Sequence, residues 1–172
     1  MEIKILDLIQ SIRTPVGDML MCFITKLGNA GIIWILLAVI LLMIPKTRKS
    51  GIILAVALCV DLVLCNGILK YLFVRIRPCD VNTSIQLLIP RPHDYSFPSG
   101  HTAASFAAVA ALYLAGEKKI WPPVLVMACL IAFSRMYLYV HYPTDILGGI
   151  LVGFLSGYIG WKIVKLIIKK TQ

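Results

Sequence analysis

The sequence predicts an all-α fold, an integral membrane bundle of about six transmembrane helices preceded by an N-terminal amphipathic helix. Hydrophobic residues make up 59% of the 172 residues, charged residues only 15%, and the mean hydropathy is +0.88. A soluble domain of this size could not bury so much apolar surface. The formal net charge is +9, but the Lys and Arg residues lie mostly between or after apolar runs. Membrane topology and lipid headgroups explain that distribution better than binding to nucleic acid.

The apolar runs predict one domain over residues 1–172. In residues 1–14, apolar side chains recur at helical spacing opposite charged ones, as in a helix that lies in the membrane interface. A transmembrane core follows over residues 15–168. Its predicted spans are, in order, residues 15–28, 31–45, 51–73, 99–116, 120–139 and 144–168. The first span is short and carries two charged residues, so it is the least typical of the six.

The basic loops predict the orientation of these spans. The PKTRKS loop, the GEKK loop and the C-terminal lysines should lie in the cytoplasm. Counting spans then places both termini inside and puts the Pro-rich loop 74–98 and the YVHYP break outside the plasma membrane. Arg75, Arg77 and Arg91 lie on the side that this rule disfavours, so we expect these cations to have another role.

Three polar clusters fall at helix ends that this topology brings to one outer face. They are KYLFVRIRP at 70–78, PSGH at 98–101 and SRMYLYVHYPTD at 134–145. A site assembled from three separate segments is therefore expected at this face.

The first kind of side chain in these clusters suits a multiply charged oxyanion. Lys70, Arg77 and Arg135 supply cations, and an Arg fork fits phosphate oxygens well. Ser99 and Gly100 stand at the start of a predicted helix, where backbone N–H groups can approach an anion closely. Phosphate is the oxyanion that this combination predicts.

The second kind of side chain suits phosphoryl transfer to a histidine. His141 and Asp145 are four residues apart and share a helix face, so the carboxylate can orient the imidazole and stabilise its cation. This predicts His141 as a nucleophile. His101 comes from another helix and suits a general acid that protonates a leaving oxygen. No Cys/His or other metal-ligand spacing appears, so we expect no metal and no cofactor.

These three clusters resemble, in order, the motifs KxxxxxxRP, PSGH and SRxxxxxHxxxD of the type-2 phosphatidic acid phosphatase superfamily. The resemblance covers roughly residues 15–168 and no motif position departs from the pattern. It implies a six-helix membrane enzyme that needs no metal and forms a phosphohistidine. It also implies His141 as nucleophile, Asp145 as its partner and His101 as acid. The phosphate ligands that it implies are Lys70, Arg77, Ser99, Gly100 and Arg135.

Within that superfamily, the short length and the segment LLIPRPHDYSFPSGH look like bacterial undecaprenyl diphosphate phosphatases. This implies hydrolysis of undecaprenyl diphosphate to undecaprenyl phosphate at the outer leaflet, where the lipid is reused as a carrier in cell wall biogenesis. Phosphatidylglycerophosphate phosphatases share the motifs, so a phosphatidylglycerophosphate or broad phospholipid phosphatase stays an alternative. The expected partners are a lipid phosphate or diphosphate and the bilayer, with no nucleic acid and no obligate protein partner.

Rival functions from other classes also stay open. A non-catalytic lipid-binding or transport protein could keep the phosphate site, although binding alone would not need His141, Asp145 and His101. A vanadium haloperoxidase shares the motif set but is not embedded in a membrane. A metal hydrolase would need ligand spacing that the sequence lacks.

Other polar and small residues have more ordinary expected roles. Asp61 lies mid-span and is expected to make a helix contact, while Asn66 could orient Lys70 from one turn away. His93 and Asp94 are expected to be solvated loop residues. Close helix packing explains a set of glycines in the last span, Gly148, Gly149, Gly153, Gly157 and Gly160.

Overall fold

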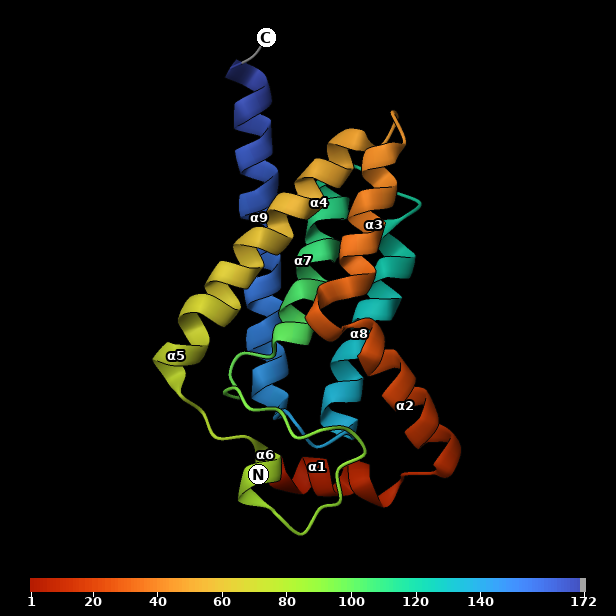
Figure 1. The fold of residues 1–172 in the computed structure, drawn as a ribbon, viewed down its shortest axis with the longest axis vertical. Coiled ribbons are helices and arrows are strands. Elements are labelled where there is room, and N and C mark those ends of the chain that lie inside the picture. The colour runs from red at the N-terminus through yellow and green to blue at the C-terminus, as the bar shows by residue number, and fades with distance from the viewer. Residues whose placement is uncertain (171–172) are drawn as a thin grey trace.

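A computed structural model describes residues 1–170, and within that range every regular element is helical, as predicted (Figure 1). The last two residues of the predicted domain 1–172 lie outside the described part. The elements are, in order, α1 (Glu2–Ser11), α2 (Pro15–Leu27), η1 (Asn29–Gly31), α3 (Ile32–Met43), α4 (Arg48–Asp61), η2 (Leu62–Leu69), α5 (Lys70–Phe73), α6 (Pro78–Val81), α7 (Gly100–Ala115), α8 (Trp121–Tyr137) and α9 (Pro143–Lys170).

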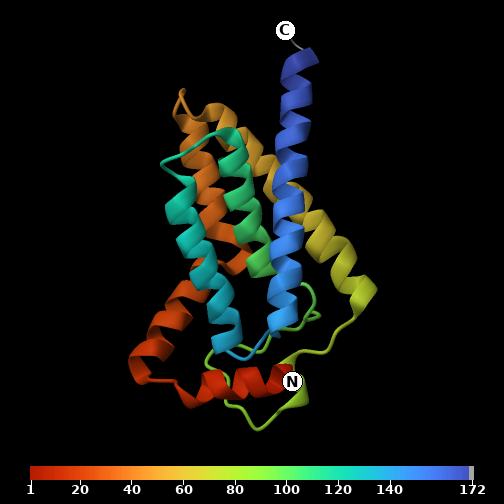
Figure 2. The same ribbon diagram turned by 180° about the vertical axis from the view of Figure 1, so that it is seen from behind.

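The two short predicted spans form one bent unit. The Thr14 side chain caps α2, and Pro15 occupies its first turn, where a missing N–H costs nothing. The chain then turns through η1, where Ala30 and Gly31 have φ of 50° and 68°, and α3 continues at an angle of 47°. Figure 2 shows that α2 and then α3 both run towards the same end of the bundle. The pair therefore advances once along the bundle, so the prediction of two separate spans here is wrong.

By length and composition, the described residues contain two helical stretches that could each cross a membrane, Arg48–Val81 and Pro143–Lys170. The bent pair of α2 and α3 would make a third if it crosses as one span. The apolar helices α7 and α8 are shorter. This confirms an all-helical protein with membrane-spanning character, but not a count of six spans.

Helix α1 and the last turns of α9 lie at opposite ends of the bundle (Figure 1). Glu2 in α1 contacts Thr144, which stands in the first turn of α9. From there α9 runs for 28 residues, about 42 Å, away from α1. The expectation that both termini share one side therefore disagrees with this structure, because α2 and α3 together advance the chain only once.

Close packing of α9 against α7 fixes the site helices relative to one another. A Cβ added at Gly153 would lie 2.5 Å from the Ala103 carbonyl oxygen, and one at Gly157 would lie 2.4 Å from the Ala110 Cβ. At the site end, a Cβ at Gly149 would lie 2.8 Å from the Ser99 carbonyl oxygen. The predicted close helix approach is thus confirmed at Gly149, Gly153 and Gly157, whereas Gly148 lies against the ring of the loop residue Phe97.

Helix α1 covers the end of the bundle at which α7 and α9 begin (Figure 1). Leu6 is fully buried against the core, and Gln10 Nε2 donates to the Tyr137 carbonyl oxygen at 2.7 Å. Leu8 and Ile12, two of the apolar residues at helical spacing, are exposed. The helix therefore packs on the protein through one face and leaves an apolar face uncovered.

Candidate active site

A cavity of about 910 Å³ opens between the η1 turn, α4, η2 and the helix ends that carry the three motifs. The predicted site residues that line it are Lys70, Arg77, Gly100, His101, Arg135 and His141. The other two, Ser99 and Asp145, are fully buried behind its wall. Residues 70, 100 and 141 are far apart in sequence, so folding has gathered the motifs as the topology predicted.

Lys70 and Arg77 are buried, and both bind the carboxylate of Asp94. Lys70 Nζ donates to Asp94 Oδ2 and to the Tyr95 carbonyl oxygen, the latter at 3.2 Å. Arg77 Nη2 donates to Asp94 Oδ1 at 2.6 Å, and Arg77 Nε donates to the Asp94 carbonyl oxygen at 2.8 Å. Asp94, a loop residue that stays half exposed as expected, therefore bridges the two predicted phosphate cations.

The Asp94 carboxyl stays anionic as a result. Partial burial would raise its pKa, but the hydrogen bond and charge of Lys70 and the charge of Arg77 outweigh burial and hold the pKa well below its usual range. The cavity thus already contains one bound anion, supplied by the protein itself.

Arg135, at the end of α8, is buried with an incomplete set of partners. Its Nη1 donates to Thr25 Oγ1 at 2.5 Å, while its Nε finds no partner among residues 1–170. A buried guanidinium N–H without an acceptor is costly unless a ligand supplies one. Thr25, which anchors this arginine from α2, was not predicted from the sequence.

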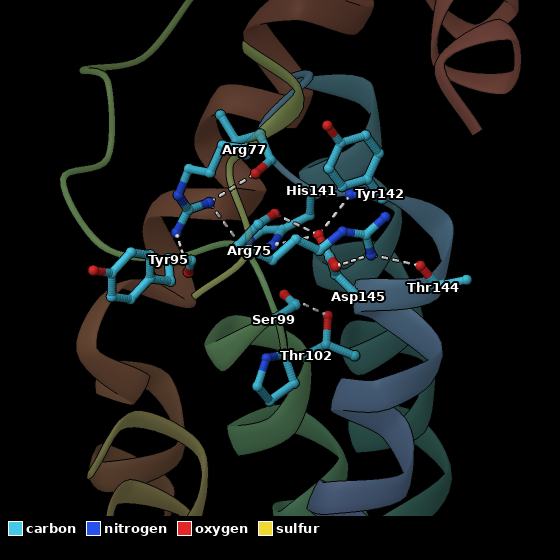
Figure 3. Close-up of polar contacts among 12 residues, drawn as sticks. Arg75, Arg77, Tyr95, Ser99, Thr102, His141, Tyr142, Thr144 and Asp145 are labelled. Carbon is cyan, nitrogen blue, oxygen red and sulfur yellow. Dashed lines mark hydrogen bonds and ion pairs between the residues drawn. The ribbon is translucent and has the colours of Figure 1, made fainter. Parts of the chain in front are cut away.

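The His141 ring lies between Arg77 and Asp145 (Figure 3). Arg77 Nη1 is 3.1 Å from His141 Nε2, and Asp145 Oδ2 is 3.4 Å from His141 Nδ1. The second distance is too long for a good hydrogen bond, and Nδ1 has no other partner in the described chain. Burial, followed by the charges of Arg77 and Arg135, holds the pKa of His141 well below its usual value, so the ring is neutral.

The Asp145 carboxylate is fully engaged by other groups. Ser96 Oγ donates to Oδ2 at 2.5 Å and the Tyr142 backbone N–H donates to the same oxygen at 2.8 Å. Arg75 Nη1 donates to Oδ1 at 2.6 Å. Ser96 was not predicted, and Arg75 was noticed only as a cation on the disfavoured side of the membrane.

His101 stands in the first turn of α7 and meets the η1 turn. Its Nε2 lies 2.9 Å from Asn29 Oδ1, and a Cβ added at Gly28 would lie 2.8 Å from its Cδ2. The bend between α2 and α3 therefore places an orienting amide on the predicted general acid. The GNAG segment at 28–31 marks a break in the sequence, but nothing in it points to His101.

Ser99 and Gly100 are placed differently from one another. Ser99 Oγ accepts a hydrogen bond from Thr102 Oγ1 at 3.0 Å, and its backbone N–H donates to the Asp145 carbonyl oxygen at 3.1 Å. Gly100 lines the cavity beside Asn66, whose Oδ1 would lie 3.0 Å from an added Cβ. The structure thus brings Gly100 to the cavity but points the Ser99 hydroxyl into the protein.

The sequence profile of the PAP2 superfamily, the type-2 phosphatidic acid phosphatases, matches residues 50–169. The chain belongs to the PAP2 superfamily. The matched range contains all three motifs and every predicted site residue, from Lys70 to Asp145.

Individual PAP2 proteins are similar over most of the chain. An undecaprenyl-diphosphatase of Sulfolobus acidocaldarius is 34% identical over 144 residues, which are 84% of this chain and 69% of that protein. The crystal structure of Aquifex aeolicus LpxE superposes with a TM-score of 0.81 at 30% identity, covering 94% of each chain. The crystal structure of a transmembrane PAP2-type phosphatidylglycerolphosphate phosphatase from Bacillus subtilis superposes with a TM-score of 0.75 at 29% identity. The match covers 99% of this chain and 86% of that one. These matches confirm the prediction of a membrane phosphatase of this superfamily.

Proposed function

We propose that this chain hydrolyses the terminal phosphate of a lipid diphosphate, undecaprenyl diphosphate, through a phosphohistidine at His141. One observation carries the proposal: Lys70 and Arg77 hold a carboxylate in the cavity, and Arg77 also contacts the nitrogen of His141 that would attack. A phosphate that displaced this carboxylate would meet two cations and a nucleophile together. The relative from Sulfolobus acidocaldarius, named as an undecaprenyl-diphosphatase, supports this choice of lipid.

The proposed first step forms a bond between His141 Nε2 and phosphorus and breaks the bond from phosphorus to the leaving lipid phosphate oxygen. Lys70, Arg77 and Arg135 bind the phosphoryl oxygens as charge accumulates on them. The backbone N–H of Gly100 adds to this set, and Ser99 would join it if its hydroxyl rotated away from Thr102. His101 gives its proton to the leaving oxygen.

In the proposed second step, water attacks the phosphohistidine. His101 takes a proton from that water, the phosphorus–nitrogen bond breaks, and inorganic phosphate leaves. Asp145 stabilises the positive charge that His141 carries while it is phosphorylated. The three cations supply the charge neutralisation for which many phosphatases use metal ions, so we propose a metal-independent reaction.

The apolar part of the cavity would hold the lipid chain. It runs between α3 and α4, where Ile35, Val39, Leu42 and Leu58 line it. A hydrocarbon in this groove would have its phosphate end at Lys70 and Arg77, since the same cavity contains both. Phosphatidylglycerophosphate is the second candidate substrate, because the Bacillus subtilis structure of that specificity covers 99% of this chain.

Phosphate release by the purified protein in detergent, with a chelator present, tests the proposed function. We expect release from undecaprenyl diphosphate to exceed release from phosphatidylglycerophosphate and phosphatidic acid. A preference for phosphatidylglycerophosphate would keep the mechanism and change the substrate. Binding of all three lipids without release would favour a non-catalytic lipid-binding or transport protein.

We further propose a single domain over residues 1–172 that crosses the plasma membrane five times. The crossings are the α2–α3 pair, the α4–α5 stretch, α7, α8 and α9. The exposed side chains of Leu8 and Ile12 would contact the membrane interface, so α1 would be an amphipathic interfacial helix. The active site and α1 would then face outward, and the basic C-terminus would lie inside.

Cysteine labelling of intact cells is expected to confirm this orientation. Single cysteines introduced at exposed Lys4 and Ser84 should react with a membrane-impermeant thiol reagent, while one at exposed Lys118 should react only after permeabilisation. The parent protein, with its own five cysteines, serves as the blank. Labelling of the cysteine at position 84 but not of the cysteine at position 4 would show that α1 lies on the cytoplasmic side, as the six-span prediction places it.

Replacing Asp94 with asparagine is expected to tighten the binding of phosphate and vanadate about tenfold, because a charged competitor leaves Lys70 and Arg77. Since the pKa of Asp94 is held well below its usual range, this competition in the parent protein should persist down to mildly acidic pH. Inhibition constants measured for both anions check the effect. Asp18→Asn, which also removes the charge of an aspartate paired with an arginine but lies outside the cavity lining, is the matched control and should leave both constants unchanged.

A further inference from the structure

We propose that Glu2 and Arg75 form a brace that positions Asp145 and sets how much of its charge reaches His141. The inference rests on the proposed function, in which His141 is the nucleophile. Neither residue belongs to the three motifs: Arg75 stands at an unspecified position of KxxxxxxRP, and Glu2 lies outside residues 50–169. Both would act through Asp145, as positioning residues.

Arg75 lies in the segment between α5 and α6 and reaches across to the start of α9 (Figure 3). Its Nη1 donates to Asp145 Oδ1 and to Thr144 Oγ1, both at 2.6 Å. Its guanidinium also stacks over the Tyr142 ring, with 4.0 Å between the guanidinium carbon and the ring centroid. These contacts fix the plane of the guanidinium, so the arginine can hold the carboxylate in only one orientation.

Glu2 completes the brace from α1. Its Oε2 accepts from Arg75 Nη2 at 2.6 Å, and its Oε1 accepts from the Thr144 backbone N–H at 3.1 Å and from Thr144 Oγ1 at 2.7 Å. Arg75 is thus shared between two carboxylates. That of Asp145 is fully buried, whereas that of Glu2 is 30% exposed.

This sharing controls the environment of His141 because Asp145 is its nearest carboxylate. With Oδ1 bound to Arg75 and Oδ2 bound to Ser96 and to the Tyr142 N–H, Asp145 stands 3.4 Å from His141 Nδ1 without a good hydrogen bond. The positive charge of Arg75 offsets the field of Asp145 at the ring, and the negative charge of Glu2 offsets that of Arg75.

The charged groups that face this pair come from every neighbouring segment. Asp145 meets Arg75, with Glu2 behind it, and the titratable Tyr142 and His141. His141 faces Arg77, Arg135, Lys70 and Asp94, and the titratable His101 of α7. Changes at Glu2 and Arg75 leave this second set in place, so their effects on His141 can be read separately.

The pH dependence of kcat/KM tests the brace, because the two variants should shift it in opposite directions. Arg75→Gln removes a positive charge near His141, so the ring should protonate more readily. We expect the acid limb to move up by about one pH unit and kcat to fall about tenfold or more. Glu2→Gln removes a negative charge, so the acid limb should move down by about half a unit with little change in kcat. Asp7→Asn, the same charge change on the same helix, contacts Tyr139 instead and should shift nothing.

A purely structural role would lower activity in both variants without moving the limb, and shifts of the same sign would also overturn the brace. Because Glu2 is partly exposed, we expect Glu2→Gln to fold. The shift of its acid limb then tests the brace by itself if Arg75→Gln does not fold. Arg75→Lys keeps the charge but loses the fork, and should restore the parental limb with reduced kcat. An active His141→Ala variant would defeat the proposed function; an inactive one together with an unmoved limb in Glu2→Gln would defeat the brace only.

Discussion

Alanine at His141 is expected to abolish phosphate release, with a loss of kcat on the order of 10³-fold or more, because it removes the proposed nucleophile from beside Arg77. The ring is buried, neutral and in contact with Arg77, which also holds the bound carboxylate of Asp94. Removing it should leave binding of lipid phosphate largely in place, since Lys70, Arg77 and Arg135 stay.

Two measurements on purified protein check this expectation. The first is phosphate release from undecaprenyl diphosphate, with unfolding temperature as the test of an intact fold. The second is trapping of labelled phosphate on the protein, which should succeed in the parent, be acid-labile, and fail in His141→Ala. The control is His93→Ala, which removes an exposed imidazole from the same face. Activity of His141→Ala within tenfold of the parent would exclude His141 as nucleophile.

Glutamine at Arg135 is expected to lower kcat/KM about 10²- to 10³-fold, because the charge on the phosphoryl oxygens grows in the transition state. The guanidinium is buried at the cavity wall, held by Thr25, with its Nε still without an acceptor in the described chain. A phosphate oxygen would satisfy that N–H. Arg135→Lys keeps the charge without the planar fork, so we expect an intermediate loss of about tenfold.

Steady-state kinetics with the lipid substrate and inhibition by vanadate check the role of Arg135 together. The loss of kcat/KM should be matched by weaker vanadate inhibition, because vanadate resembles the phosphoryl transition state. The control is Arg48→Gln, which removes an arginine at the opposite end of the bundle, where its Nε donates to the Leu42 carbonyl oxygen. A variant that loses activity but binds vanadate as the parent does would show that Arg135 supports the fold and not the phosphate.

Much of the fold was accessible from local sequence. Apolar runs of the right length predict helices because a backbone in lipid must satisfy its own hydrogen bonds. The glycines of α9 were recognisable because close helix contact leaves no room for a Cβ. The course of residues 15–45 was not, because the φ values of Ala30 and Gly31 that bend the chain there depend on the surroundings of η1.

The candidate site divides in the same way. Six candidate site residues were recognisable in the sequence because residue type and spacing encode their chemistry. They are Lys70, Arg77, His101, Arg135, His141 and Asp145. The residues that orient them could not be recognised, because a single hydrogen bond from a distant segment needs no particular spacing in the chain. They are Asn29, Thr25, Ser96 and Glu2.

Residue chemistry and spacing were therefore sufficient to predict a membrane phosphatase with a phosphate site built from three motifs. The three-dimensional arrangement was needed to show that Asp94 binds both Lys70 and Arg77, that the Ser99 hydroxyl points inward and that α1 lies at the site. The motifs contain the side chains proposed to react, and each of these side chains must be of a particular chemical type, which the sequence shows directly. The contacts that orient those groups depend on where the folded chain brings its distant segments together.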